Sequence, residues 1–306
     1  MKVTCAGFAF FLSFLCFLLV AQTARRRQAV PSPSFDLRAN PAEIGDALAE
    51  ICPRNNIIWK EDGTASGCSI CPAGTTFQDE RGQGFELRLR RATLGHFTSP
   101  QAENIILSVV GCEPHSTNFG GSFVFVLESG RPRFLAYNQA LITEPCHKLN
   151  FPNGRNFLVC RMEWGGQGMQ WSYIYSVAFE RDGKSEITPI FTTEDTVGTC
   201  GEGAEGTPTG PVQRSSIENI RFPDLNGDGN ADISITATLG RKLLTAAEQT
   251  TCLRAQGKSD VGKGPLRVPA RKYEIKFLFD GNHFKVAHDS RTTIKLFPDP
   301  RPPFSN

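Results

Sequence analysis

The chain has 306 residues, of which 33 are Lys or Arg and 31 are Asp or Glu, so its formal net charge is +2. This near balance, without a sustained basic face, excludes the electrostatic footprint of a nucleic-acid-binding protein or of a protein that binds acidic membrane surfaces. With 29 Gly, 20 Pro and 23 Phe against three Met, the composition favours many short strands joined by turns over a helical bundle.

The N-terminal segment has the pattern of an export signal. An apolar run over residues 6–21 follows Lys2, and the small residues at 21–24 are typical of a cleavage zone. We therefore predict a secretory signal peptide at residues 1–24, an exposed linker at residues 25–40, and a secreted, periplasmic or cell-surface location. Three arginines directly behind the apolar run oppose the usual charge bias, so an uncleaved anchor stays open as the alternative. We expect no membrane span in the mature chain, because no other segment is long and apolar enough.

The cysteine count agrees with export. Of ten cysteines, Cys5 and Cys16 lie in the predicted signal, which leaves eight in the mature chain. An even number in an exported chain favours disulfide bonds, although spacing alone does not determine the pairing. Matching positions in the sequence suggest two pairs, Cys112–Cys146 and Cys160–Cys200, with the other four cysteines paired among themselves.

One short helix is expected near the start of the mature chain, in a helical and Cys-rich segment over residues 41–92. Asn40 is suited to the N-cap and Pro41 to the first helical position. Apolar residues at 44, 47, 48 and 51 fall on one face, and Pro53 limits the helix. A weaker helical pattern covers residues 246–253.

From residue 85 onward the sequence alternates apolar and polar residues in short runs separated by Gly, Pro or Asn, which is typical of strands. The fold class is therefore mainly β, with antiparallel short strands. The predicted strands are residues 85–90, 105–110, 122–127, 133–137, 157–160, 171–179, 233–239 and 273–279.

The most informative stretch is Asp224-Leu-Asn-Gly-Asp-Gly-Asn-Ala-Asp232. It places oxygen-bearing side chains on alternate residues of a Gly-containing turn, the arrangement that Ca²⁺ needs to collect six to eight oxygen ligands. The predicted ligands are Asp224, Asn226, Asp228, Asn230 through its backbone carbonyl, and Asp232. The twelfth position, where an EF-hand carries its bidentate Glu, is Ile235, and a strand pattern follows the loop instead of a helix. The alternative is an Asp/Asn/Gly-rich turn without metal.

A loop of the form D-x-N-x-D-G-x-x-D that leads into a strand resembles the calcium loops of FG-GAP and VCBS-type repeats, specifically over residues 222–235. The resemblance implies blades of a secreted or cell-surface β-propeller, with Ca²⁺ as the bound ion and a protein or glycan at the cell surface as the partner. Residues 93–306 would form this β-repeat domain.

Three imperfect copies of one pattern are present, at residues 94–147, 148–215 and 216–290. Each copy has an aromatic residue, a polar turn, a strand, an excursion, a long strand and a hairpin turn. Only the third copy keeps the full set of carboxylates. Because propellers close with about four to eight blades, either residues 50–92 supply a fourth unit or the copies pack as an open stack of sheets.

The sequence predicts no catalytic residues: nucleophile elbow, P-loop, dinucleotide and zinc-protease patterns are all absent. The expected role is structural or adhesive binding. Two alternatives remain: a hydrolase that uses Glu113, His115 or Glu163, and a carbohydrate-binding module that uses Trp164 and Trp171. The Cys68-Ser-Ile-Cys71 motif is interpreted as two disulfide cysteines, because it opens no helix that would lower a thiol pKa and has no second C-x-x-C for zinc.

Overall fold

The computed structural model describes residues 40–78, 80, 84–166, 168–201, 210–256 and 266–301, all of which belong to one compact unit, Pro33–Asn306. The predicted signal peptide, and all of the predicted linker except Asn40, lie outside the described residues. The elements in chain order are α2 (Pro41–Ile51), η1 (Arg54–Asn56), β1 (Ile57–Trp59), β2 (Ala65–Cys68), β3 (Leu87–Ser99), β4 (Ala102–Val110), η2 (His115–Thr117), β5 (Gly120–Glu128), β6 (Arg131–Gln139), β7 (Cys146–Asn150), β8 (Asn156–Gly166), β9 (Met169–Phe179), β10 (Ser185–Asp195), η3 (Val197–Thr199), β11 (Val212–Arg221), β12 (Ile233–Lys242), α3 (Ala246–Gln256), β13 (Arg271–Phe279), β14 (Phe284–Val286), η5 (His288–Ser290) and α4 (Arg291–Ile294).

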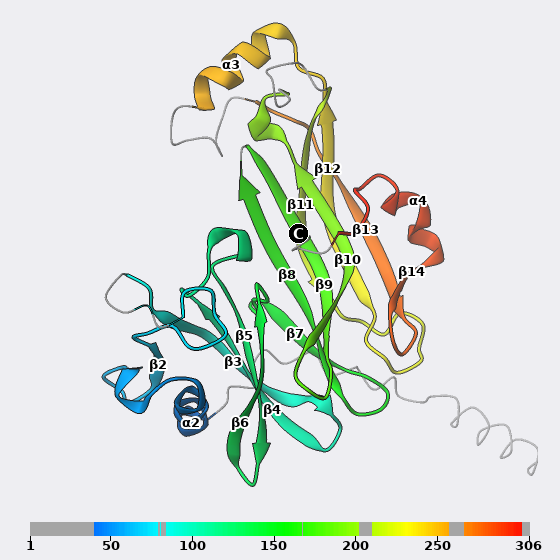
Figure 1. Cartoon of the computed structure of the whole chain (residues 1–306). Coiled ribbons are helices and arrows are strands. Elements are labelled where there is room, and N and C mark those ends of the chain that lie inside the picture. Colours follow the sequence, from blue (N-terminus) through cyan, green and yellow to red (C-terminus); the bar gives the residue numbers. More distant parts are fainter. Residues whose placement is uncertain are drawn as a thin grey trace, which may run out of the picture. The chain divides into compact units, whose positions relative to one another are not determined.

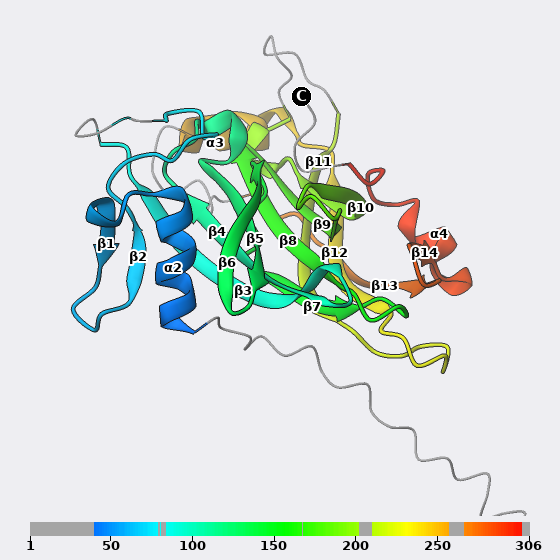
Figure 2. The ribbon, with the colours of Figure 1, turned by 60° about the horizontal axis from the view of Figure 1, so that its bottom comes forward.

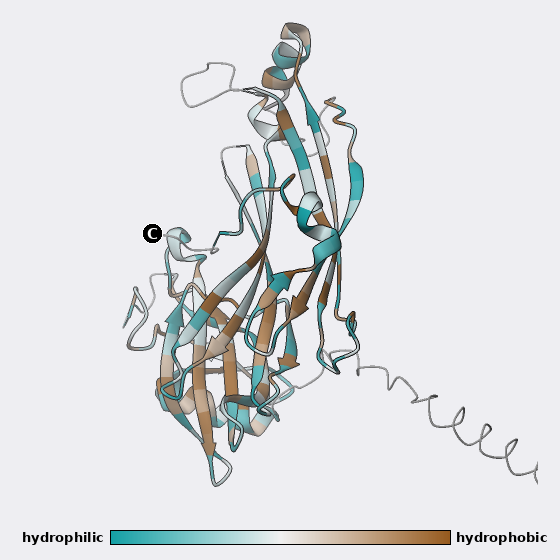
Figure 3. Cartoon of the chain, turned by 90° about the vertical axis from the view of Figure 1, so that its right-hand side faces the viewer, coloured by the Kyte–Doolittle hydropathy of each residue, from teal (hydrophilic) through white to brown (hydrophobic). Residues whose placement is uncertain are grey.

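The mainly β prediction is confirmed. The strands form three antiparallel sheets, which we name the N-terminal sheet (order β1-β2-β3-β4-β5-β6), the middle sheet (β10-β9-β8-β7) and the C-terminal sheet (β11-β12-β13-β14) (Figure 1). Each is a meander in which strands that are consecutive in the chain are also neighbours in the sheet. Brown and teal residues alternate along many of the strands in Figure 3, which is the period of two on which the strand predictions rested.

The middle sheet is buried on both faces. Phe157 and Val159 of β8 belong to an apolar cluster shared with the C-terminal sheet, whereas Leu158 and Cys160 belong to a cluster shared with the N-terminal sheet. Successive side chains of a strand point to opposite faces, so a strand covered on both sides needs a continuous apolar run. The sheets are therefore packed face to face, the middle sheet against each of the other two, and this arrangement matches the open-stack form of the predicted architecture.

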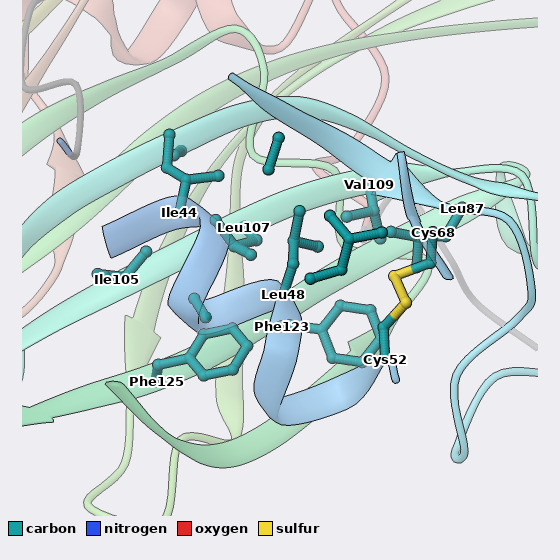
Figure 4. Packing of buried hydrophobic residues seen from close by; sticks show 14 of the residues in the cluster. Ile44, Leu48, Cys52, Cys68, Leu87, Ile105, Leu107, Val109, Phe123 and Phe125 are labelled. Atoms are coloured by element: carbon teal, nitrogen blue, oxygen red, sulfur yellow. A yellow bond between two sulfur atoms is a disulfide. The ribbon is translucent and has the colours of Figure 1, made fainter. Parts of the chain in front are cut away.

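Helix α2 covers the remaining face of the N-terminal sheet and lies beside β2 and β6 (Figure 2). Its start is capped as predicted: the Asn40 side chain accepts from the Ala42 amide at 3.1 Å, and Glu43 accepts from the Asn40 amide at 3.1 Å. Leu48 is fully buried and packs among Phe123, Phe125 and other core residues (Figure 4). The weaker helical pattern at residues 246–253 is also confirmed, as α3.

The predicted repeat boundaries do not coincide with the boundaries of the sheets. The boundary at 147/148 falls inside β7, and the boundary at 215/216 falls inside β11. The second and third copies therefore start part-way through the first strand of a meander, whereas the first copy starts part-way through β3, the third strand of the N-terminal sheet.

All eight cysteines of residues 40–301 form disulfides, but the two pairs suggested by the sequence are wrong. The bonds are Cys52–Cys68, Cys71–Cys112, Cys146–Cys160 and Cys200–Cys252. Cys146 and Cys160 lie directly opposite each other in β7 and β8, with their Cα atoms 4.0 Å apart. The register of the β7–β8 hairpin brings these two cysteines together. This register cannot be inferred from matching positions in a sequence repeat. Cys68 and Cys71 bond to different partners, as expected for structural cysteines.

Candidate metal centre

The predicted calcium loop connects β11 to β12 and lies outside regular secondary structure. β12 starts at Ile233, immediately after Asp232, so the loop leads into a strand as predicted. Gly227 and Gly229 have φ of 79° and 87°, in the left-handed region where a residue without Cβ is least strained. These two glycines adopt this conformation without strain, and Asp228 between them is exposed.

The carboxylates of the loop organise its backbone. The Asp224 carboxylate accepts from the Gly227 amide at 2.6 Å and from the Gly229 amide at 3.1 Å. Asp228 accepts from the Asn230 amide at 2.8 Å, and this hydrogen bond lowers the pKa of the Asp228 carboxyl. The Asn226 side chain accepts from the Asp228 amide at 3.1 Å and donates to the Asp228 carboxylate at 3.0 Å. The loop is therefore ordered by its own polar side chains before any ligand is considered.

Asp232 differs from the other residues of the loop because it is fully buried. One oxygen accepts from the Leu225 amide at 2.8 Å and the other from the Phe279 amide at 2.7 Å. Its own amide donates to the Pro223 carbonyl at 2.8 Å. Asp232 thus joins the start of the loop, the start of β12 and the end of β13, which is 47 residues further along the chain.

All charged side chains of the loop are negative. Burial raises the pKa of Asp232, and the negative charges of Asp228 and Asp224 raise it further, against the two backbone hydrogen bonds that lower it. None of these three carboxylates forms an ion pair with a Lys, Arg or His among the described residues. A divalent cation would reduce this repulsion and favour the charged form of Asp232.

The donor set fits a hard cation in its chemistry, since the predicted ligands offer carboxylate, amide and carbonyl oxygens and neither nitrogen nor sulfur. A carboxylate oxygen that accepts one backbone N–H keeps a second lone-pair site for a metal. Within the described ranges, however, the structure gathers no three His, Cys, Asp or Glu side chains into a ready metal-binding group. The Asp224 and Asp228 carboxylates accept hydrogen bonds from the loop amides, and their remaining lone pairs would be available to an ion.

The residues considered for hydrolysis are not assembled into a site. Glu113 is 2% exposed, and its carboxylate accepts from the Tyr137 hydroxyl at 3.0 Å and from the Gln139 amide group at 2.7 Å. Burial, followed by the charge of Glu113, raises the pKa of Tyr137. His115 is exposed in η2, with its ring 6.3 Å from that of Trp164. Glu163 directly precedes Trp164 in β8, so it points to the opposite face, where it pairs with Arg161.

The tryptophans considered for carbohydrate binding do not form a flat surface. Trp164 and Trp171 are cross-strand neighbours whose ring centroids lie 4.9 Å apart, but the ring planes are inclined by 40° and both side chains are half-buried. Tyr175, on the same strand as Trp171, is fully buried. This geometry agrees better with a small aromatic cluster at the end of the β8–β9 hairpin than with a sugar-stacking platform.

Comparisons with protein-family models, curated proteins and solved structures give no match for this chain. Between residues 40 and 301, as far as they are described, no helix has the length and apolar character needed to cross a membrane. Sequence reasoning missed two features: the hydrogen bond from the Phe279 amide to Asp232, and a polar cavity next to the β13–β14 hairpin. Both depend on contacts between distant strands, for which one sequence carries no signal.

Proposed function

We propose that this chain is an exported, calcium-binding β-repeat protein with a structural or adhesive role and no catalytic activity. The ion would bind at Asp224, Asn226, Asp228, Asn230 through its carbonyl, and Asp232. The partner would be a protein or glycan at the cell surface. The likeness of residues 222–235 to FG-GAP and VCBS-type loops supports this proposal.

The observation that carries the proposal is the buried Asp232. A buried carboxylate with two other carboxylates nearby and no cationic partner among the described residues is costly in the charged form, and protein interiors normally offset such a charge with a counter-ion or a metal. Because Asp232 also binds the Phe279 amide, an ion at this loop would stabilise the contact between the β11–β12 turn and the end of β13. The ion's role would therefore be to fix the C-terminal sheet.

Export is supported by the four disulfides. Such bonds persist in oxidising compartments and are rare in the cytosol. With all eight described cysteines bonded, no free thiol among them calls for a redox or metal role.

The test is thermal unfolding of the mature chain in calcium, in magnesium and in chelator. We expect calcium to raise the melting temperature, because a ligand that binds only the folded state stabilises it by RT ln(1 + [L]/Kd), which is about 2.7 kcal/mol at 100 times Kd. Magnesium should have a smaller effect, since it demands near-octahedral geometry and gives up its water reluctantly. Equal melting temperatures in calcium and in chelator would contradict the proposal.

A further inference from the structure

A polar cavity of about 220 Å³ lies where the middle sheet meets the last hairpin of the C-terminal sheet. Phe151 and Arg155 from the turn before β8, Glu186 from β10 and His283 from the β13–β14 hairpin line it, together with Phe157 and several hydroxyl and amide side chains. The turn and the hairpin lie against each other: a Cβ placed on Gly281 would lie 3.6 Å from Cγ of Pro152. Three segments that are far apart in the sequence therefore build one concave polar surface.

Arg155 is held in place without a counter-charge. Its Nη2 donates to the Phe179 carbonyl at 3.0 Å, and its guanidinium carbon lies 5.4 Å from the centroid of the Phe151 ring. The Arg155 Nε is buried with no hydrogen-bond acceptor, and no described carboxylate lies within ion-pair distance of the guanidinium. A planar cation fixed by stacking and one backbone bond retains donors for a carboxylate.

Glu186 contributes the opposite charge to the same cavity. It is exposed, and it lies opposite Ala178 in the β9–β10 ladder, on the face of the sheet that carries Ser176 and Thr188. None of the described Lys, Arg or His side chains forms an ion pair with it. Arg155 and Glu186 thus line one cavity, carry opposite charges and do not pair with each other.

The size of the cavity limits the ligand. At about 30 Å³ for each water molecule, 220 Å³ corresponds to on the order of seven waters. It is smaller than the pockets of roughly 300–1,000 Å³ that hold drug-sized ligands. The concave part of the surface therefore has room for one small molecule.

We propose that this cavity binds a free α-amino acid, with its carboxylate on Arg155 and its ammonium group on Glu186. A simple anion bound to Arg155 would leave Glu186 unpaired and add a second negative charge to the cavity. A simple cation bound to Glu186 would leave Arg155 unpaired and add a second positive charge to the cavity. A zwitterion satisfies both groups at once, and Ser176 and Thr188, which are opposite each other on β9 and β10, line the same cavity with hydroxyls that can accept or donate hydrogen bonds. Phe151 and Phe157 supply an apolar wall for a small side chain.

Isothermal titration calorimetry on the mature chain tests this proposal, with glycine, L-serine and the other natural amino acids as probes and with acetate and methylammonium as single-charge controls. The titrations are run in chelator and repeated in calcium, so that failure of the calcium proposal and failure of this one are distinguishable. We expect saturable binding of at least one amino acid in chelator, and none of acetate or methylammonium at the same concentrations.

The variants Arg155→Gln and Glu186→Gln should each weaken binding by at least about tenfold. The controls Arg181→Gln and Glu180→Gln, in the neighbouring β9–β10 turn but outside the cavity, should leave it unchanged. Because Glu186 is exposed, its variant is expected to fold, and near-ultraviolet circular dichroism checks this for all four proteins. The proposal is overturned if no amino acid binds in the millimolar range, if acetate binds as tightly as glycine, or if Glu186→Gln has the parent's affinity.

Discussion

Replacing Asp228 by Asn tests whether the Asp228 side chain binds a metal ion or only stabilises the turn. The Asp228 side chain is exposed, and its carboxylate accepts from the Asn230 amide at 2.8 Å. Asn retains one oxygen for that hydrogen bond but removes a negative charge from the loop. In chelator we therefore expect the free energy of unfolding to change by no more than about 0.5 kcal/mol, as for most surface substitutions.

In calcium the same variant should lose stability. Calcium affinity depends on the number of charged ligands, and we expect Asp228→Asn to weaken binding by at least about tenfold, which corresponds to about 1.4 kcal/mol at a fixed, saturating calcium concentration. For a chain of this size 1 kcal/mol shifts the melting temperature by roughly 2–4 °C, so the expected decrease in calcium is about 3–6 °C. Differential scanning calorimetry in calcium and in chelator measures both values.

Asp62 provides a matched control. It is exposed, and its carboxylate accepts from the Thr64 amide at 2.9 Å in the β1–β2 turn, so it has the same local role as Asp228 but lies outside the predicted calcium loop. Asp62→Asn should give the same difference between calcium and chelator as the parent protein. If Asp228→Asn also keeps the parent's full calcium-dependent shift, Asp228 is not a ligand and the reasoning about the loop is refuted.

Three further predictions follow from buried groups. In chelator, burial and two nearby carboxylates raise the pKa of Asp232, so the folded state binds the Asp232 proton more tightly than the unfolded chain does. This proton binding stabilises the fold fully below the ordinary pKa of an Asp carboxyl. The stabilisation is lost as the pH rises through the raised pKa of the folded state. Urea denaturation across that window should show this decline, and either Asp232→Asn or saturating calcium should flatten it; an unchanged slope in both would contradict the assignment. Leu48→Ala should cost about 2–5 kcal/mol by the shift of the urea midpoint, whereas Leu243→Ala, at a side chain 74% exposed, should cost almost nothing; equal shifts would contradict the packing of α2. Glu113→Ala removes a buried carboxylate that accepts from the Tyr137 hydroxyl and the Gln139 amide group, and it should cost at least about 2 kcal/mol. Glu163→Ala, at an exposed ion pair, should cost less than about 1 kcal/mol, and a reversed order would contradict the network around Glu113.

The parts of the fold that the sequence predicted are those whose cause is local. Asn40 and Pro41 specify the start of α2 through hydrogen bonds within a single turn, and Gly227 and Gly229 specify a loop that ends where Ile233 begins a strand. Capping, turn conformation and apolar alternation act over a few residues, so they can be identified without knowledge of tertiary contacts.

Strands β7, β10 and β11 were missed for a physical reason. β10 contains Pro189 and several threonines, and its pairing with β9 is irregular between Pro189 and Phe191, which hides the alternation. β7 and β11 are short or strongly polar on one side, and their place is determined by the neighbouring strand. The Cys146–Cys160 bond follows from the β7–β8 register and was missed with it.

The candidate site likewise has a local part that the sequence predicted and a long-range part that it did not. The oxygen ligands of the loop lie within nine residues and were predicted together, but the hydrogen bond from the Phe279 amide to Asp232 spans 47 residues and had no sequence signal. Arg155 lies in the turn before β8 and Glu186 lies in β10, and they line one cavity because the strand order β10-β9-β8 brings these two parts of the middle sheet together.

Calcium binding at the β11–β12 loop is tested most directly by a calcium titration of the mature chain in isothermal titration calorimetry. We expect one calcium ion per chain, bound with a Kd on the order of 10⁻⁴ M or tighter, within the range of extracellular calcium modules, and loss of this binding in Asp232→Ala. The absence of saturable heat at millimolar calcium in a protein shown to be folded, or an unchanged stoichiometry in Asp232→Ala, would contradict this expectation.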